Sequence, residues 1–211
     1  MAVKVGIINY DMGNIQSVAN ALSFLGHTPI ISDNPHVLME ADAYILPGVG
    51  AFGEAIKNLN NRGLIEFLNT EVLINKKPIL GICLGMQLMT NSSLELGKYK
   101  GFGWIDAEVV PIPKNKNICV PHVGWNNIHI KIKEPLFSHI KQESHFYFDH
   151  SFYVSSYDTD SVTATCNNGV EMCISLRKDN IFATQFHPEK SQTNGLKVLR
   201  NFLNYSEASL W

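Results

Sequence analysis

The residue with the clearest chemical context is Cys83, which lies between two glycines in the segment GICLG. This glycine-x-nucleophile-x-glycine pattern is typical of a sharp turn from a strand into a helix, which leaves the nucleophile exposed above a sheet. The positive end of the helix favours a thiolate, and the Leu84 amide is placed to stabilise an oxyanion. A buried structural cysteine between turn glycines is the alternative, and this motif alone does not separate the two.

A second candidate group is His187 and Glu189, in the segment FHPE that follows another apolar run. Open α/β sheets gather their sites outside the carboxyl ends of their strands, so His187 can lie near Cys83, although spacing alone does not place it there. A neutral imidazole takes a thiol proton and later protonates a leaving group, and a carboxylate holds its tautomer. An exposed histidine beside a turn proline is the alternative. The cysteine motif favours catalysis.

The segment PGVG, residues 47–50, also follows an apolar strand. Glycines on both sides of Val49 let a backbone amide turn toward the thiol, so Val49 and Gly50 are candidates for a second oxyanion donor. Alone, the segment also fits an ordinary turn between a strand and a helix.

The elements that must position these residues alternate in the first half of the chain. Apolar runs of strand length are separated by helical patterns, which predicts a doubly wound, mostly parallel central sheet flanked by helices, an α/β fold. Asn14 is the expected cap of the first helix, and Gly63 is the expected break in the second. The predicted strands cover residues 3–9, 28–32, 43–46 and 79–82, and the predicted helices cover 15–25 and 51–73.

The second half of the chain shows short strand patterns separated by turn residues, which predicts an added antiparallel strand layer. Some of these strands are expected to extend the main sheet, and a C-terminal helix carries Leu196 and Phe202. The predicted strands cover residues 105–110, 128–132, 146–148, 162–166, 172–176 and 181–185. Without a repeat or linker, we expect residues 1–211 to form a single domain.

Composition limits the possible functions. The 211 residues are 45% hydrophobic and 17% charged, which argues against a disordered or coiled-coil chain. The net charge of -2 lacks the basic excess expected for a nucleic-acid partner. No apolar stretch is long enough for a membrane span or signal segment. The four cysteines form no CxxC pair, so we expect reduced thiols, a cytoplasmic protein, no metal and no cofactor.

Together these motifs resemble the class I (triad) glutamine amidotransferases. PGVGAFG, PHVGWN and FHPEKSQ are similar to the glutaminase subunits of imidazole glycerol phosphate synthases. The resemblance implies hydrolysis of glutamine to glutamate and ammonia through a thioester on Cys83. It also implies that Gln87, Glu95 and Gly50 contact glutamine, and that His150 and Ser151 line the site.

The resemblance to these glutaminase subunits implies a heterodimer with a (β/α)8 cyclase. The cyclase receives the ammonia through a channel and makes imidazole glycerol phosphate and AICAR in histidine biosynthesis. The resemblance implies that the lone subunit is almost inactive. Loops at residues 11–14 and 121–126 and around 190 are expected to face the partner, with Trp125 as an aromatic anchor. The predicted interface residues are Asp11, Met12, Asn14, Pro121, His122, Trp125, Asn126 and Lys190.

Some positions depart from the usual family pattern, and they leave alternatives open. Asn9, Asp11 and Asp149 differ, and we expect none of them to touch Cys83, His187 or Glu189. They put the ammonia acceptor in question: a paralogous subunit that supplies a sugar-modifying partner in surface-polysaccharide biosynthesis is the alternative. Two other classes remain, a cysteine peptidase or thiol stress protein, and a non-catalytic scaffold that binds a partner.

Overall fold

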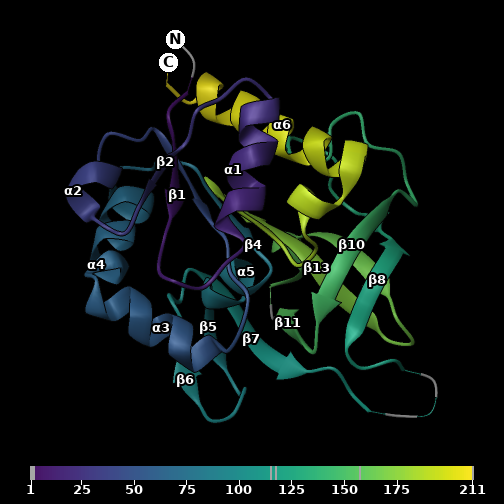
Figure 1. The fold of residues 1–211 in the computed structure, drawn as a ribbon. Helices are drawn as coiled ribbons and strands as arrows, with labels where there is room; N and C mark the ends of the chain where they lie inside the picture. Colours follow the sequence, from purple (N-terminus) through teal and green to yellow (C-terminus); the bar gives the residue numbers. More distant parts are fainter. Residues whose placement is uncertain (1–2, 115, 117, 157, 211) are drawn as a thin grey trace.

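Five parallel strands form the part of the main sheet that carries the predicted motifs (Figure 1). The computed structural model describes residues 3–114, 116, 118–156 and 158–210. All residues of the four inner strands are buried, which explains their unbroken apolar runs. Along the sheet the order is β2 (Ile30–Ser32), β1 (Val5–Ile8), β3 (Ala43–Leu46), β4 (Ile79–Ile82) and β14 (Ile181–Thr184).

Helices cover both faces of these strands. On one face α1 (Ile15–Phe24) and α6 (Gln192–Ala208) share an apolar cluster with β1 and β4. The other face carries α2 (Pro35–Leu38), α3 (Phe52–Asn61), α4 (Leu64–Asn69) and a π-helical turn, η1 (Thr70–Ile74). The break at Gly63 is confirmed, because its φ of 66° is left-handed. Asn14 is the N-cap residue of α1, as predicted, but its side chain makes no cap hydrogen bond.

Mainly antiparallel strands extend the sheet beyond β14, which confirms the predicted fold class. Among the described residues of this part, only β5 and β7 pair in parallel. The hairpin of β5 and β6 and the strand β11 were not predicted. The strands are β13 (Glu171–Lys178), β11 (Phe152–Ser156), β7 (Ile105–Pro111), β5 (Thr90–Ser93) and β6 (Tyr99–Lys100), with β12 (Val162–Asn167) and β9 (His129–Ile130) beside β13, and a 3-10 turn, η2 (Thr159–Ser161), precedes β12.

A separate antiparallel ribbon joins β8 (His122–Asn127) and β10 (His145–His150), which lie side by side in Figure 1. The prediction of a loop over residues 121–126 was therefore wrong, because the segment HVGWNN pairs along its whole length with β10. The alternation of a strand puts His122 inside and leaves Val123 and Trp125 exposed. Across the described part of the chain, no helix is long and apolar enough to cross a membrane.

Candidate active site

Cys83 occupies a strained turn between β4 and α5 (Leu84–Leu88). Its φ of 53° and ψ of -108° lie outside the regions that non-glycine residues ordinarily adopt. The flanking glycines have a steric reason: a Cβ atom on Gly85 would lie 1.8 Å from the carbonyl oxygen of Leu46, and one on Gly81 would lie 2.8 Å from the Gly85 backbone. Strand and helix therefore approach too closely for side chains at either position.

His187 and Glu189 follow β14, which pairs in parallel with β4 and so ends at the same edge of the sheet as Cys83. Glu189 lies in a short 3-10 turn, η3 (Pro188–Lys190), and its Oε1 accepts a hydrogen bond of 2.8 Å from Nδ1 of His187. Only 2% of each side chain is exposed. Because the carboxylate holds the Nδ1 proton, Nε2 is left as the nitrogen that exchanges a proton, and it has no hydrogen-bond partner among the described residues.

The charge environment favours a protonated His187. Burial alone lowers the pKa of His187, but its interactions with Cys83 and Glu189 outweigh this effect and raise that pKa to about 10. The backbone amide of Cys83 donates a 2.7 Å hydrogen bond to the carbonyl oxygen of Thr184, three residues before His187, so both residues lie at the ends of paired strands. The structure therefore brings Cys83, His187 and Glu189 into one cluster, as the spacing of the motifs alone could not.

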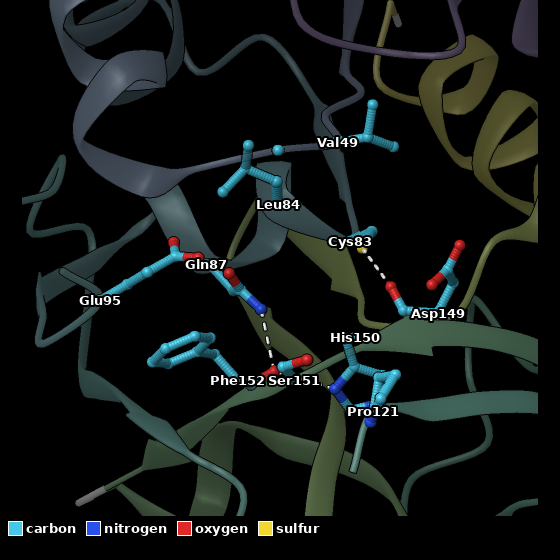
Figure 2. Close-up of a pocket in the computed structure, with 11 residues that line it drawn as sticks. Val49, Cys83, Leu84, Gln87, Glu95, Pro121, Asp149, His150, Ser151 and Phe152 are labelled. Carbon is cyan, nitrogen blue, oxygen red and sulfur yellow. Dashed lines mark hydrogen bonds between the residues drawn. The ribbon is translucent and has the colours of Figure 1, made fainter.

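The Cys83 thiol contacts two groups that the sequence did not indicate. Its Sγ lies 3.5 Å from Nε2 of Gln185. It also lies 3.9 Å from the carbonyl oxygen of Asp149, a contact that Figure 2 marks with a dashed line. The expectation that Asp149 does not touch Cys83 was therefore wrong, because β10 ends directly beside the thiol. Gln185 is fully buried at the end of an apolar strand, and a polar residue in such a run was the one available signal.

A cavity of about 400 Å³ opens beside the thiol, a size in the range of small-molecule sites. His187 and Glu189 are not part of its lining. Every residue that we predicted for the oxyanion hole and for glutamine lines this cavity. The lining is Val49, Gly50, Cys83, Leu84, Gln87, Glu95, Pro121, Asp149, His150, Ser151 and Phe152.

Two predicted substrate contacts are engaged within the chain. The Glu95 carboxylate accepts a 2.8 Å hydrogen bond from the backbone amide of Phe52, the first residue of α3. Nε2 of Gln87 donates to the carbonyl oxygen of Phe152 and to Oε1 of Gln185, each over 3.1 Å. Figure 2 shows the Gln87 amide directed to the Phe152 carbonyl below the thiol.

The Val49–Gly50 turn is supported from the loop that follows β1. The hydroxyl of Tyr10, a fully buried residue that the sequence analysis did not single out, donates a 2.7 Å hydrogen bond to the carbonyl oxygen of Pro47. Met12 packs against Gly50, where a Cβ atom would lie 2.8 Å from its methyl group. Gly50 has a φ of 105°, which glycine adopts without strain.

The residues predicted to face a partner separate into exposed and buried sets. Asp11, Pro121 and Trp125 are exposed, and Asn14, Asn126 and Lys190 are half-buried. The prediction that Met12 and His122 face a partner was wrong. Their side chains are only 9% and 4% exposed, because other parts of the chain cover them. Asp11 forms an ion pair with Arg62 at the end of α3.

The family model described as "Glutamine amidotransferase class-I" matches residues 7–205 of the chain. The chain belongs to this family. It is 50% identical over 198 residues to the imidazole glycerol phosphate synthase subunit HisH 1 of Campylobacter jejuni subsp. jejuni serotype O:23/36 (strain 81-176), covering 94% of this chain and 98% of that protein. Against the subunit HisH of Geobacter sulfurreducens it is 42% identical, covering 94% and 97%.

Solved structures agree in fold. A structure titled as a glutamine amidotransferase aligns with a TM-score of 0.76 at 19% identity, covering 96% of this chain and 98% of that one. The PurLQS structure from Thermotoga maritima aligns with a TM-score of 0.75 at 18% identity, covering 97% and 99%. This amidotransferase therefore has the family fold, and the comparisons decide against a cysteine peptidase or thiol stress protein.

Proposed function

We propose that this amidotransferase is the glutaminase subunit of an imidazole glycerol phosphate synthase. It would hydrolyse L-glutamine to glutamate and ammonia and pass the ammonia to a (β/α)8 cyclase, which makes imidazole glycerol phosphate and AICAR in histidine biosynthesis. The observation that carries the proposal is the cluster of Cys83, His187 and Glu189, of which Cys83 lines a cavity of about 400 Å³, in a chain 50% identical to a HisH subunit.

The chemistry follows from the atoms at the edge of the sheet. Sγ of Cys83 attacks the side-chain amide carbon of glutamine, and the developing oxyanion is stabilised by backbone amides at Leu84 and in the Val49–Gly50 turn. His187 delivers its Nε2 proton to the leaving nitrogen, so ammonia departs and a glutamyl thioester remains. His187 then takes a proton from a water that attacks the thioester, which releases glutamate and leaves the Cys83 thiolate beside a protonated His187, as at the start.

The cavity lining supports glutamine as the substrate. The Glu95 carboxylate is placed to pair with the substrate ammonium, Gln87 to contact the substrate, and His150 and Ser151 to form the wall beside it. The Glu95 carboxylate also accepts a hydrogen bond from the amide of Phe52, so in this proposal substrate and α3 share one carboxylate.

The proposed partner surface is the exposed face of the β8–β10 ribbon together with Asp11, Asn14 and Lys190. Trp125 is 49% exposed and Val123 is 54% exposed, although both lie on a regular strand. Trp125 meets the Tyr147 ring edge-on at 6.1 Å, and the Lys190 ammonium lies 5.5 Å from the centre of that ring. A preformed aromatic group of this kind suits an interface anchor. The proposal places the reaction in the cytosol, where free cysteines stay reduced.

A second candidate is a paralogous subunit that supplies ammonia to a sugar-modifying partner. It is favoured by Asp11, one of the positions that depart from the pattern of the resemblance, which stands in a left-handed conformation with a φ of 65°. Its ion pair with Arg62 changes the loop that we propose faces the partner. The chemistry at Cys83 is the same in both candidates, so only the acceptor distinguishes them.

The test is to mix the chain with the cyclase subunit from the same organism and to measure glutamate release with and without the cyclase's nucleotide substrate. The proposal predicts slow turnover by the chain alone and strong stimulation by the complex. Stimulation by a sugar-modifying partner instead would support the second candidate. Fast turnover by the free chain would contradict the proposed coupling, and no turnover in any mixture would support a non-catalytic scaffold.

A further inference from the structure

Two buried histidines, His122 on β8 and His150 on β10, form a hydrogen-bonded pair beside the cavity. His122 Nδ1 lies 3.0 Å from His150 Nε2, and His150 Nδ1 lies 2.8 Å from the carbonyl oxygen of Phe152. On the other side, Nε2 of His122 lies 3.2 Å from Nδ2 of Asn126. Both imidazoles are almost completely covered, at 4% and 6% exposure.

Backbone groups at both ends determine the direction of every hydrogen bond in this chain of contacts. The Asn126 amide is oriented by the Asn127 N–H, which donates to Oδ1, and by the Asn167 carbonyl, which accepts from Nδ2. Nδ2 therefore donates to His122 as well. A carbonyl oxygen can only accept, so at the other end His150 Nδ1 carries a proton for Phe152.

The two ends require the same arrangement of protons. With Nδ1 protonated, a neutral His150 has a lone pair on Nε2, which accepts from Nδ1 of His122. His122 in turn has its lone pair on Nε2, which accepts from Asn126. Burial lowers the pKa of both histidines, that of His150 to about 4, so both are neutral at pH 7.

The carbonyl oxygen of Phe152 is where this chain meets the groups at the thiol. It accepts one hydrogen bond from His150 and a second from Nε2 of Gln87. Gln87 also donates to Oε1 of Gln185, which leaves the Gln185 Nε2 to donate to Sγ of Cys83 over 3.5 Å. The donors thus run in one direction from Asn126 to the Phe152 carbonyl, which accepts from both sides, and a second run of donors leads from Gln87 through Gln185 to the sulfur.

We propose that His122 and His150 are positioning residues, each held in the Nδ1–H tautomer, that orient the Phe152 carbonyl and through it the Gln87 and Gln185 amides at the Cys83 thiol. This inference rests on the proposed glutaminase function only for its effect on turnover. The hydrogen-bond directions themselves are properties of the free chain.

The first test therefore needs no activity. Two-bond ¹H–¹⁵N correlation spectra of the full chain with ¹⁵N-labelled histidine report which ring nitrogen is protonated, and single variants assign the signals. Neutral histidine in water favours the Nε2–H tautomer, whereas the inference predicts Nδ1–H for both residues at pH 7. The Nε2–H tautomer at either His122 or His150 would overturn the inference, whether or not the chain hydrolyses glutamine.

The second test compares His150→Asn with His150→Phe in the complex with the cyclase. The Asn side chain places its amide near the position of Nδ1 and keeps the donor to Phe152, whereas Phe keeps the ring volume and loses the donor. Positioning predicts a kcat/KM for the Phe variant at least about tenfold below that of the Asn variant, the cost of one buried hydrogen bond. A packing role predicts the opposite order, because Asn leaves a void.

His122→Asn and His122→Phe repeat the comparison one step further from the thiol and are expected to show the same order with a smaller difference. His129→Phe, at a histidine whose side chain is 62% exposed, is the control for a general effect of the substitution. A Phe variant as active as its Asn counterpart at both positions would overturn the positioning role. If His150→Phe does not fold, the kcat/KM values of the two His122 variants and the tautomers seen by NMR still test the positioning role.

Discussion

The carboxyl edge of the parallel sheet and the β8–β10 ribbon both border the cavity, but they hold their residues in different ways. At the edge, Cys83 and His187 follow adjacent strands, and backbone sterics fix the turn at the thiol. On the ribbon, buried His122 and His150 are held by hydrogen bonds between side chains, while Trp125 on the outer face is held mainly by one neighbouring ring. The edge thus holds the residues of the proposed chemistry. The inner face of the ribbon orients the groups around the thiol, and its outer face is the proposed docking surface for the partner.

The largest effect that separates the two regions is expected from Cys83→Ala. Without the nucleophile, glutamate release by the complex should fall on the order of 10⁵-fold or more. Synthesis from added ammonium salts should survive, because the cyclase chemistry lies elsewhere. Parallel assays with glutamine and with ammonium chloride measure the two activities. Loss of both would contradict the assignment of the glutaminase activity to this chain and of the cyclase activity to its partner.

Glu189→Gln keeps the size of the side chain and removes its charge. We expect kcat to fall roughly 10³-fold to 10⁴-fold, because the amide no longer stabilises the imidazolium or selects its tautomer. The pKa of His187 should fall as well, since Glu189 is one of the two groups that raise it. Steady-state kinetics and an NMR titration of His187 measure both effects. An unchanged pKa would show that Glu189 does not act on the imidazole charge.

Trp125→Ala tests the outer face of the ribbon. The affinity for the cyclase should fall about 100-fold if Trp125 is an anchor, while the stability of the free chain changes little because half of the side chain is already exposed. Phe148→Ala, a fully buried position on β10, is the matched contrast and should destabilise the chain by about 3–5 kcal/mol. Calorimetry of binding and thermal unfolding separate the two. Equal affinities of wild type and Trp125→Ala would remove Trp125 from the interface.

The smallest effect is the pH dependence that the ribbon contributes to stability. The pKa of His150 is lowered to about 4 in the folded chain, whereas in the unfolded chain it has the ordinary histidine value of about 6.5. Between these two values the unfolded state binds the extra proton, so stability falls as the pH falls. From pH 6.5 to pH 5 the wild type should lose about 1–2 kcal/mol more than His150→Asn. The pKa of His187 is raised, so its contribution to stability is fully present below its unfolded pKa and is lost only as the pH rises. Denaturant unfolding at both pH values decides, and identical losses would contradict a neutral, buried His150.

Sequence reasoning succeeded where short-range rules apply. Apolar runs placed β3 and β4 at their observed ends, and the glycines around Cys83 marked a turn whose close approach the structure explains. Gly63 marked the end of α3 for the same local reason.

Sequence reasoning failed where long-range pairing decides. The segment HVGWNN has a glycine and two asparagines and lacks strand propensity, yet it becomes β8 because β10 pairs with it. That pairing turned His122 inward, away from the predicted interface. Gln185 was missed because its partner, the Cys83 thiol, is 102 residues away in the chain.

The most direct test of the central claim is to treat the chain, with its cyclase partner, with a glutamine-mimicking electrophile and to locate the adduct by mass spectrometry. The exposed Cys119 is an internal control for simple accessibility, because Cys83 is buried. The account predicts one adduct on Cys83, prevented by excess glutamine and lost in a His187→Ala variant. Modification of Cys119 in preference to Cys83, or equal labelling of Cys83 without His187, would contradict it.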